Sequence, residues 1–151
     1  MPDWFTVLSR MKKYEILEHT ADIRVKIFAD NQEELFKNSA ICLFELLTDT
    51  KIEAKKTKTI ELSAPKLEDL LIFWLNELLS VFYSNKFLPG EYQVSIKEAA
   101  GKKTITAEIK GQDFNPYGDK GVKSEIKAAT YHNLKINKDK NGFTAEVIFD
   151  V

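Results

Sequence analysis

One segment limits the possible folds of this chain more than any other. Residues 66–85 read KLEDLLIFWLNELLSVFYSN, directly after Pro65, and their apolar side chains recur at helical spacing. The predicted core face carries Leu67, Leu70, Leu71, Trp74, Leu78 and Phe82, and it is widened by Phe73, Leu75 and Leu79. Because a helix this apolar must be covered on more than one side, other elements have to pack around it. We therefore expect Trp74 and Phe73 in the core.

A second amphipathic helix is predicted within residues 30–48. Its apolar positions recur at helical spacing, and Asn31 with Glu34 three residues later forms a capping box. Cys42 lies on the apolar face, where a thiol is usually inert packing. It is the only cysteine and cannot form an internal disulfide, which favours a reducing compartment.

The remaining segments alternate with the period of two that is typical of strands. Such runs lie on both sides of the EHTAD stretch at 18–22 and again at 57–64. Two hairpins follow, one over 91–111 with Gly101 at positive φ and one over 125–150 with Asn141-Gly142 in its turn. A loop is expected at 112–121. The predicted fold class is α+β, with one largely antiparallel sheet, or a pair of sheets, and two long amphipathic helices.

Composition and charge exclude several classes of function for this chain. The chain has 22 basic and 23 acidic residues, a net charge of −1, which argues against direct gripping of nucleic acid. The longest apolar run, at 70–75, is too short to span a bilayer, and residues 1–10 lack the features of a signal peptide. We expect a cytoplasmic protein with no membrane partner. We also expect the native start at Met11, so that 1–10 is a leader and 11–151 forms one domain.

Carboxylates are the candidates for chemistry, because phosphate-binding glycine loops, a nucleophile elbow and a zinc helix are all absent from the sequence. Asp22 begins one predicted strand, and Asp150 ends another beside the α-carboxylate of Val151. Acids at strand ends can converge at one sheet edge and offer hard oxygen ligands to Ca²⁺, Mg²⁺ or Mn²⁺. Without a cation, two carboxylates ~4 Å apart would repel by about 4 kcal/mol. The alternative is that Asp22 caps a turn and Asp150 is an ordinary exposed acid.

The two histidines and one lysine also have alternative interpretations. His19 can be a site residue or can donate to a backbone carbonyl in the bend. His132 is expected to be a half-buried packing residue in a strand. Lys127, flanked by apolar positions, is either a solvated strand lysine or an ammonium partly withdrawn from water that pairs with an acid or a phosphate.

Several motifs in this order resemble the archease family. They are YEILEHTADIRV, NQEELFKNSAICLFELLTD, LEDLLIFWLNELL, EIKAATYHNLKI and the terminal FTAEVIFDV, collinear from about residue 11 to 151. The resemblance implies a small α+β protein that activates RtcB-type RNA ligases. These ligases join 2′,3′-cyclic-phosphate or 3′-phosphate ends to 5′-hydroxyl ends, as in tRNA splicing. The implied role is to promote ligase guanylylation and multiple turnover, with tRNA contacted only through the ligase.

The resemblance also implies a divalent-metal pocket, with calcium the most expected cation. By motif match its ligands fall on Asp22, Asp150 and Val151, and the lysine implied in activation falls on Lys127. The chain departs from the family pattern in two places. Gln112 opens a loop that lacks the usual histidine, and Asn133 follows His132 where an aspartate is common.

The sequence is also compatible with two other functions. One is an interaction or chaperone-like module in which the acidic pocket only stabilises the fold. The other is a metal-dependent phosphoesterase, since open carboxylate sites can hydrolyse phosphate esters. A second acid cluster for two metals is not evident in the sequence, which makes the phosphoesterase the weaker of the two.

Overall fold

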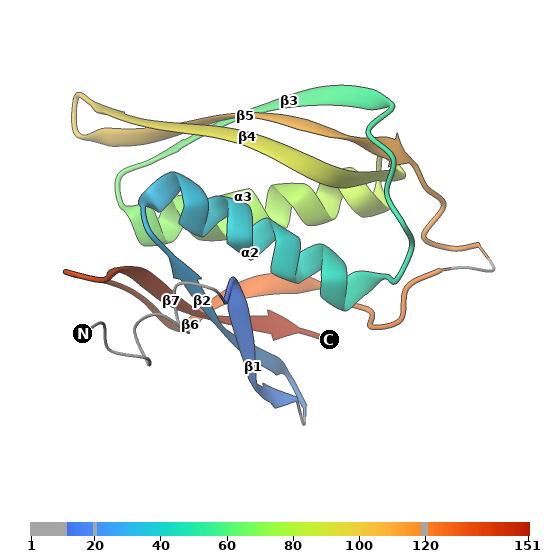
Figure 1. Ribbon diagram of the computed structural model, residues 1–151, viewed down its shortest axis with the longest axis horizontal. Coiled ribbons are helices and arrows are strands. Elements are labelled where there is room, and N and C mark those ends of the chain that lie inside the picture. The colour runs from blue at the N-terminus through green and yellow to red at the C-terminus, as the bar shows by residue number, and fades with distance from the viewer. Residues whose placement is uncertain (1–11, 20, 119–120) are drawn as a thin grey trace, which may run out of the picture.

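Two antiparallel sheets enclose a layer of two helices in the computed structural model (Figure 1). The structure describes residues 12–19, 21–118 and 121–151. Along the chain its elements are β1 (Tyr14–His19), β2 (Ile23–Ala29), α2 (Gln32–Leu47), β3 (Lys56–Ala64), α3 (Leu67–Tyr83), β4 (Phe87–Ala99), β5 (Lys102–Asp113), β6 (Ala128–Asp139) and β7 (Gly142–Asp150). One sheet has the strand order β1-β2-β7-β6 and the other β3-β5-β4. The predicted α+β class is confirmed, with two sheets rather than one.

Helix α3 is covered on more than one side, as its sequence requires. Trp74 is fully buried, and its indole nitrogen donates to the backbone oxygen of Phe36 in α2 at 3.0 Å. The expectation for Phe73 was wrong, because its side chain is 43% exposed. Ser80, seven residues later and on the same side of the helix, is also exposed, so this stripe of α3 faces solvent.

Helix α2 begins as its sequence predicts, with one shift. The Asn31 side chain accepts from the Glu34 N–H at 2.8 Å, while the Glu34 carboxylate accepts from the N–H of Asp30, at 3.1 Å, instead of Asn31. Cys42 is fully buried among core residues. This burial raises the pKa of the Cys42 thiol, which keeps it protonated and inert.

The β6–β7 hairpin sets the register of the first sheet. Its turn consists of Lys140 and Asn141, one residue earlier than the predicted Asn141-Gly142. The Asp139 side chain accepts from the Asn141 N–H at 2.7 Å and so stabilises the earlier turn. Gly142 instead starts β7 with a φ of +125°, where a Cβ atom would lie 2.3 Å from the Ala29 oxygen. The second hairpin has Gly101 at φ +76°, as expected.

Strand β6 contains a wide irregularity in its pairing with β7. Thr130 pairs with Ile148, but the next recorded pair joins Lys135 to Glu146, so β6 has extra residues at 131–134. A bulge of this kind releases side chains from strict alternation. As a result Tyr131 is 51% exposed and His132 is exposed, so the half-buried packing role expected for His132 was wrong.

Other expectations are met only in part or lie outside the described residues. Strand β5 extends to Asp113, so the loop predicted at 112–121 begins two residues late. The leader at 1–10 is not described, and the boundary at Met11 stays a prediction. Neither α2 nor α3 has the length and apolar character needed to cross a membrane, and the described residues contain no other candidate helix.

Substitution of Gly142 tests the close approach between β7 and β2. We expect Gly142→Ala to lower the free energy of unfolding by about 3 kcal/mol, because it adds a steric clash to backbone strain. Gly101→Ala is the matched control, since that residue also has positive φ but no atom lies within 4 Å of the added Cβ. It should cost only about 1 kcal/mol. The free energies of unfolding are measured by denaturant titration. Equal losses for the two variants would contradict the close contact between Gly142 and the Ala29 oxygen.

Candidate functional site

The register of the first sheet brings the two candidate aspartates to the same sheet end. Ile23 in β2 pairs with Phe149 in β7, and this is the outermost recorded pair of the two strands. Asp150 follows Phe149 at the end of β7, and Asp22 precedes Ile23 in the bend between β1 and β2. Both aspartates therefore lie one residue beyond the same strand pair, and their convergence on one cation stays a prediction.

The neighbouring strands bring the other predicted residues to the same end of this sheet. Ala128 in β6 pairs with Asp150, and the backbone N–H of Lys127 donates to the Asp150 carbonyl oxygen at 2.8 Å. On the other side, His19 at the end of β1 pairs with Ile23. Lys127 and His19 thus flank the aspartates and Val151. We refer to these residues, Asp22, Asp150, Val151, Lys127 and His19, as the acidic sheet end.

The acidic sheet end is open to solvent. The side chains of Asp22, Asp150, Lys127 and His19 are exposed, and Val151 is 39% exposed. Of the two interpretations of Lys127, the structure supports the solvated lysine. Among the described residues no ion pair joins Lys127 to either aspartate. These charged groups are available for a ligand or a partner.

The donor chemistry of the acidic sheet end fits a hard divalent cation, with few protein ligands. Asp22, Asp150 and the main-chain oxygens of Val151 are oxygen donors of the type that Ca²⁺ and Mg²⁺ prefer. In the part of the chain that is described, no three His, Cys, Asp or Glu side chains gather as a metal-binding group. A cation here would depend on main-chain oxygens and would keep an open side. The metal site stays a prediction.

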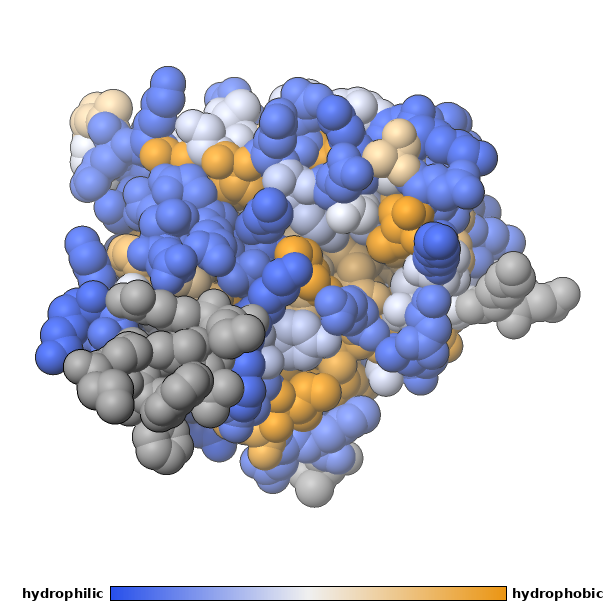
Figure 2. Space-filling view, viewed as in Figure 1, coloured by the Kyte–Doolittle hydropathy of each residue, from blue (hydrophilic) through white to orange (hydrophobic). Residues whose placement is uncertain are grey.

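An edge strand with exposed apolar side chains adjoins the acidic sheet end. Ile16 is 47% and Leu17 is 39% exposed on β1, at the irregularity where its pairing with β2 shifts. Figure 2 shows hydrophobic surface in the lower centre of this view, where Figure 1 places β1. Tyr14 anchors the strand to α2 by donating to the Glu45 carboxylate at 2.9 Å. Burial and this hydrogen bond both raise the Tyr14 pKa.

Asn76 is a positioning residue that the sequence reasoning missed. From α3 its side-chain amide donates to the Ala129 oxygen at 3.1 Å, and its side-chain oxygen accepts from the Ala129 N–H at 2.8 Å. Because β6 lies at the edge of its sheet, these backbone groups have no partner strand. Asn76 thereby fixes β6 two residues from Lys127. The available signal was a lone amide within the apolar run LLIFWLNELL.

The segment leading to Lys127 is held at two further points. The Lys123 N–H donates to the Leu47 oxygen at the end of α2, at 2.8 Å, and the Lys123 ammonium pairs with Asp49 at 2.7 Å. Ile126 is fully buried in the core. These contacts tie the position of Lys127 to the helix layer as well as to β7.

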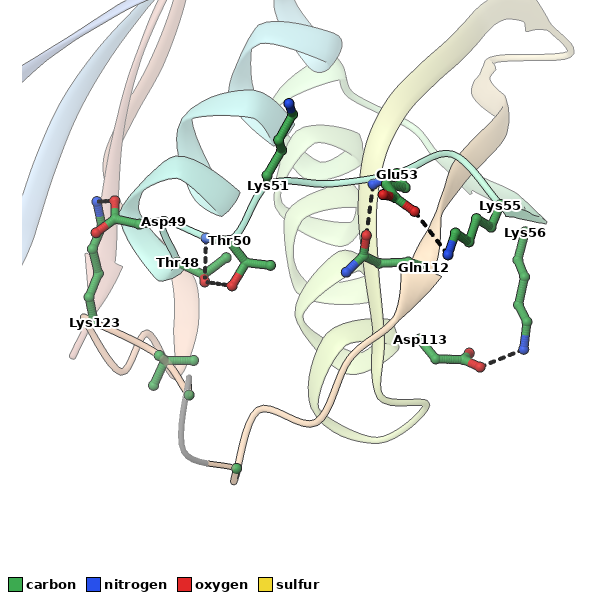
Figure 3. A pocket seen from close by; sticks show the side chains of 13 residues that line it. Thr48, Asp49, Thr50, Lys51, Glu53, Lys55, Lys56, Gln112, Asp113 and Lys123 are labelled. Carbon is green, nitrogen blue, oxygen red and sulfur yellow. Dashed lines mark hydrogen bonds and ion pairs between the residues drawn. The ribbon is translucent and has the colours of Figure 1, made fainter.

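A large hollow lies elsewhere in the molecule. A cavity of about 1080 Å³ separates the 48–56 segment from the 112–123 region, and none of the residues of the acidic sheet end lines it. Figure 3 shows Lys56 paired with Asp113 and Lys55 with Glu53, while Gln112 accepts from the Glu53 N–H, and Lys51 has no ion pair among the described residues. Because most of the lining charges are paired, we assign no ligand to the cavity.

Of the two positions at which the sequence departs from the archease pattern, the structure places one. Gln112 lines the cavity and contributes nothing to the acidic sheet end. The Asn133 side chain and Thr20 of the HTAD motif lie outside what the structure describes. The departure at Gln112 therefore does not alter the residues predicted to hold a cation.

Fold and site together define a small α+β protein with a helix layer between two sheets and a charged, solvent-open sheet end. The model of the Archease protein family matches residues 14–151. Protein archease of Methanosarcina barkeri is 38% identical over 145 residues, covering 95% of this chain and 99% of that protein. Protein archease of Sulfurisphaera tokodaii is 35% identical over 144 residues, covering 93% and 100%. The chain belongs to the Archease protein family.

A solved structure agrees with this assignment. The solution structure of Methanobacterium thermoautotrophicum protein 1598 is similar with a TM-score of 0.80 and 29% sequence identity. The match covers 92% of this chain and 99% of that one. The helix layer between two sheets is therefore shared across nearly the whole of both chains.

Replacing Asn76 tests its positioning of β6. Asn76→Leu should lower the free energy of unfolding by about 2 kcal/mol, because both Ala129 backbone groups lose their partner. Hydrogen exchange of the Ala129 amide should also accelerate. Glu77→Leu, the next residue on the same helix, is the control and should change stability by less than about 0.5 kcal/mol. Unchanged exchange at Ala129 in Asn76→Leu would refute this role.

Proposed function

We propose that this chain is an accessory activator of an RtcB-type RNA ligase and has no catalytic role of its own. Family membership over residues 14–151 supports the proposal. The observation that carries it is the place of Asp22 and Asp150, each one residue beyond the Ile23–Phe149 pair, with the Lys127 N–H hydrogen-bonded to the Asp150 carbonyl oxygen. An accessory protein needs charged groups that are reachable by a partner, and these groups are exposed.

The proposed partner seals RNA ends during tRNA splicing in the cytoplasm. The ligase joins a 3′-phosphate or 2′,3′-cyclic phosphate to a 5′-hydroxyl, and the activator promotes ligase guanylylation and multiple turnover. With a net charge of −1 the chain lacks the basic excess needed to bind tRNA by itself. Its contact with RNA would therefore pass through the ligase. The exposed Ile16 and Leu17 on β1 would add an apolar contact for a protein partner.

Asp22, Asp150 and the oxygens of Val151 would hold a divalent cation, with Ca²⁺ favoured and Mg²⁺ or Mn²⁺ as alternatives. When bound, the cation supplies a positive centre with open coordination positions for phosphate oxygens. Lys127 adds one exposed positive charge on the β6 side of the acidic sheet end. His19 borders the opposite side, at the end of β1. The chain itself would contribute orientation and charge, while the ligase would provide the reacting groups.

Removal of either aspartate tests this function. A ligation assay would use a trace of the cognate ligase with GTP and Mn²⁺, and would count products per ligase. The unmodified chain should raise the yield well above one equivalent, while Asp22→Ala and Asp150→Ala should reduce stimulation at least about tenfold, since loss of one of few ligands weakens a metal site by this order. Glu61→Ala, an exposed acid on β3, should stimulate normally. Full stimulation by both aspartate variants would exclude the cation from the mechanism.

Extension beyond Val151 tests its oxygens as ligands. A short Gly-Ser tail fused after Val151 should weaken stimulation, because the added residues crowd the open side of the site. The same tail fused at the other end of the chain is the control. Retained activity with the tail after Val151 would remove this residue from the ligand set.

A further inference from the structure

Arg24 stands on the same face of the sheet as Asp150, one row further in. Ile23, Val25 and Ile27 of β2 are fully buried toward the helices, so Arg24 and Lys26 point to the opposite face. Arg24 pairs with Ile148, Asp150 is the next residue outward on this face of β7, and Asp22 lies in the bend that leads into β2. The positive residue nearest to the aspartates on this face of β2 is therefore Arg24.

The Nε atom of Arg24 is buried and has no hydrogen-bond partner, and the same is true of Thr130 Oγ1 on the far side of Ile148. Across the β1–β2 pair, the residue opposite Arg24 is Glu18. Among the described residues no ion pair of Arg24 is recorded. A buried Nε means that the side chain is packed along the face instead of extending freely into water, so its positive charge is held in place.

Geometry brings this charge within electrostatic range of the aspartates. The Cα atoms of two residues that are two apart in sequence lie at most about 7 Å apart, which bounds the separation of Arg24 and Asp22. Asp150 is the diagonal neighbour across the β2–β7 pair, at about 7–8 Å and within reach of a long side chain. Both distances are shorter than the Debye length of about 10 Å at 0.1 M salt, so screening leaves much of the interaction.

We propose that Arg24 is a built-in counter-charge that lowers the affinity of the acidic sheet end for divalent cations. The inference rests on the proposed cation site and adds a residue that sets its strength. Without a cation, Arg24 offsets the repulsion between Asp22 and Asp150. With a cation bound, the same charge opposes it. The net effect is a site that fills and empties readily, as suits an activator that engages its partner repeatedly.

Calorimetric titration with CaCl₂ at 0.1 M salt tests this role without a ligase. Arg24→Gln should bind Ca²⁺ about fivefold more tightly than the unmodified chain, from Coulomb interaction at this distance with partial screening. Arg24→Lys keeps the charge and should remain within about twofold. Lys26→Gln is the matched control on the same face, because Lys26 is four residues, or about 13 Å, from Asp22 and should change affinity less than twofold.

Two further variants separate the failure of this inference from failure of the proposed function. Asp150→Ala should abolish the binding signal, which places the titrated cation at the acidic sheet end. If Asp150→Ala abolishes binding but Arg24→Gln binds no more tightly than Lys26→Gln, the role of Arg24 is refuted and the cation site stands. If the unmodified chain gives no binding signal, both the cation site and the role of Arg24 fail. Should Arg24→Gln not fold, Arg24→Met keeps the stem and carries the same expectation.

Discussion

The apolar surface of α3 is the constraint on which the rest of the structure depends. A helix that carries Trp74 and a broad set of leucines cannot rest on a single sheet with its other side in water. One sheet therefore covers each side of the helix layer, and α2 packs alongside, joined by the Trp74 bond to Phe36. The sheet that contains β2 and β7 becomes buried on one face only, which gives β2 and β7 strict alternation. That alternation leaves Arg24 and Asp150 on the open face.

Strand register then determines which exposed residues lie together at the acidic sheet end. Side chains on a strand alternate with a period of two, so a slip of one residue would turn the buried Val25 and Phe149 toward solvent. The hydrophobic cost of such a slip holds Asp22 and Asp150 at the same sheet end. Gly142 and its close approach to Ala29 hold the register from the opposite end of the same strand pair. The placement of the two exposed acids thus depends on buried residues of the same two strands.

Features that follow from periodicity and local chemistry could be predicted from the sequence. The strands around EHTAD, the cap at Asn31 and the burial of Cys42 all depend on neighbours a few residues away. The failures needed knowledge of packing. Phe73 is exposed because it lies with Ser80 on a stripe of α3 that faces solvent, and His132 is exposed because β6 bulges against β7. Asn76 was missed because its partner, Ala129, lies 53 residues away.

Charge pairing distinguishes the two polar regions of this protein. Around the cavity, Lys55, Lys56 and Lys123 each have an acidic partner within an ion-pair distance, and among its described lysines only Lys51 has none. At the acidic sheet end two aspartates lie beyond the same strand pair, and no ion pair of Lys127 or Arg24 is found among the described residues. Repulsion between the aspartates, which Arg24 offsets only in part, costs stability in the isolated chain, and this cost is recovered when a cation binds. On this reasoning the acidic sheet end, and not the cavity, is the place where a cation and a partner would act.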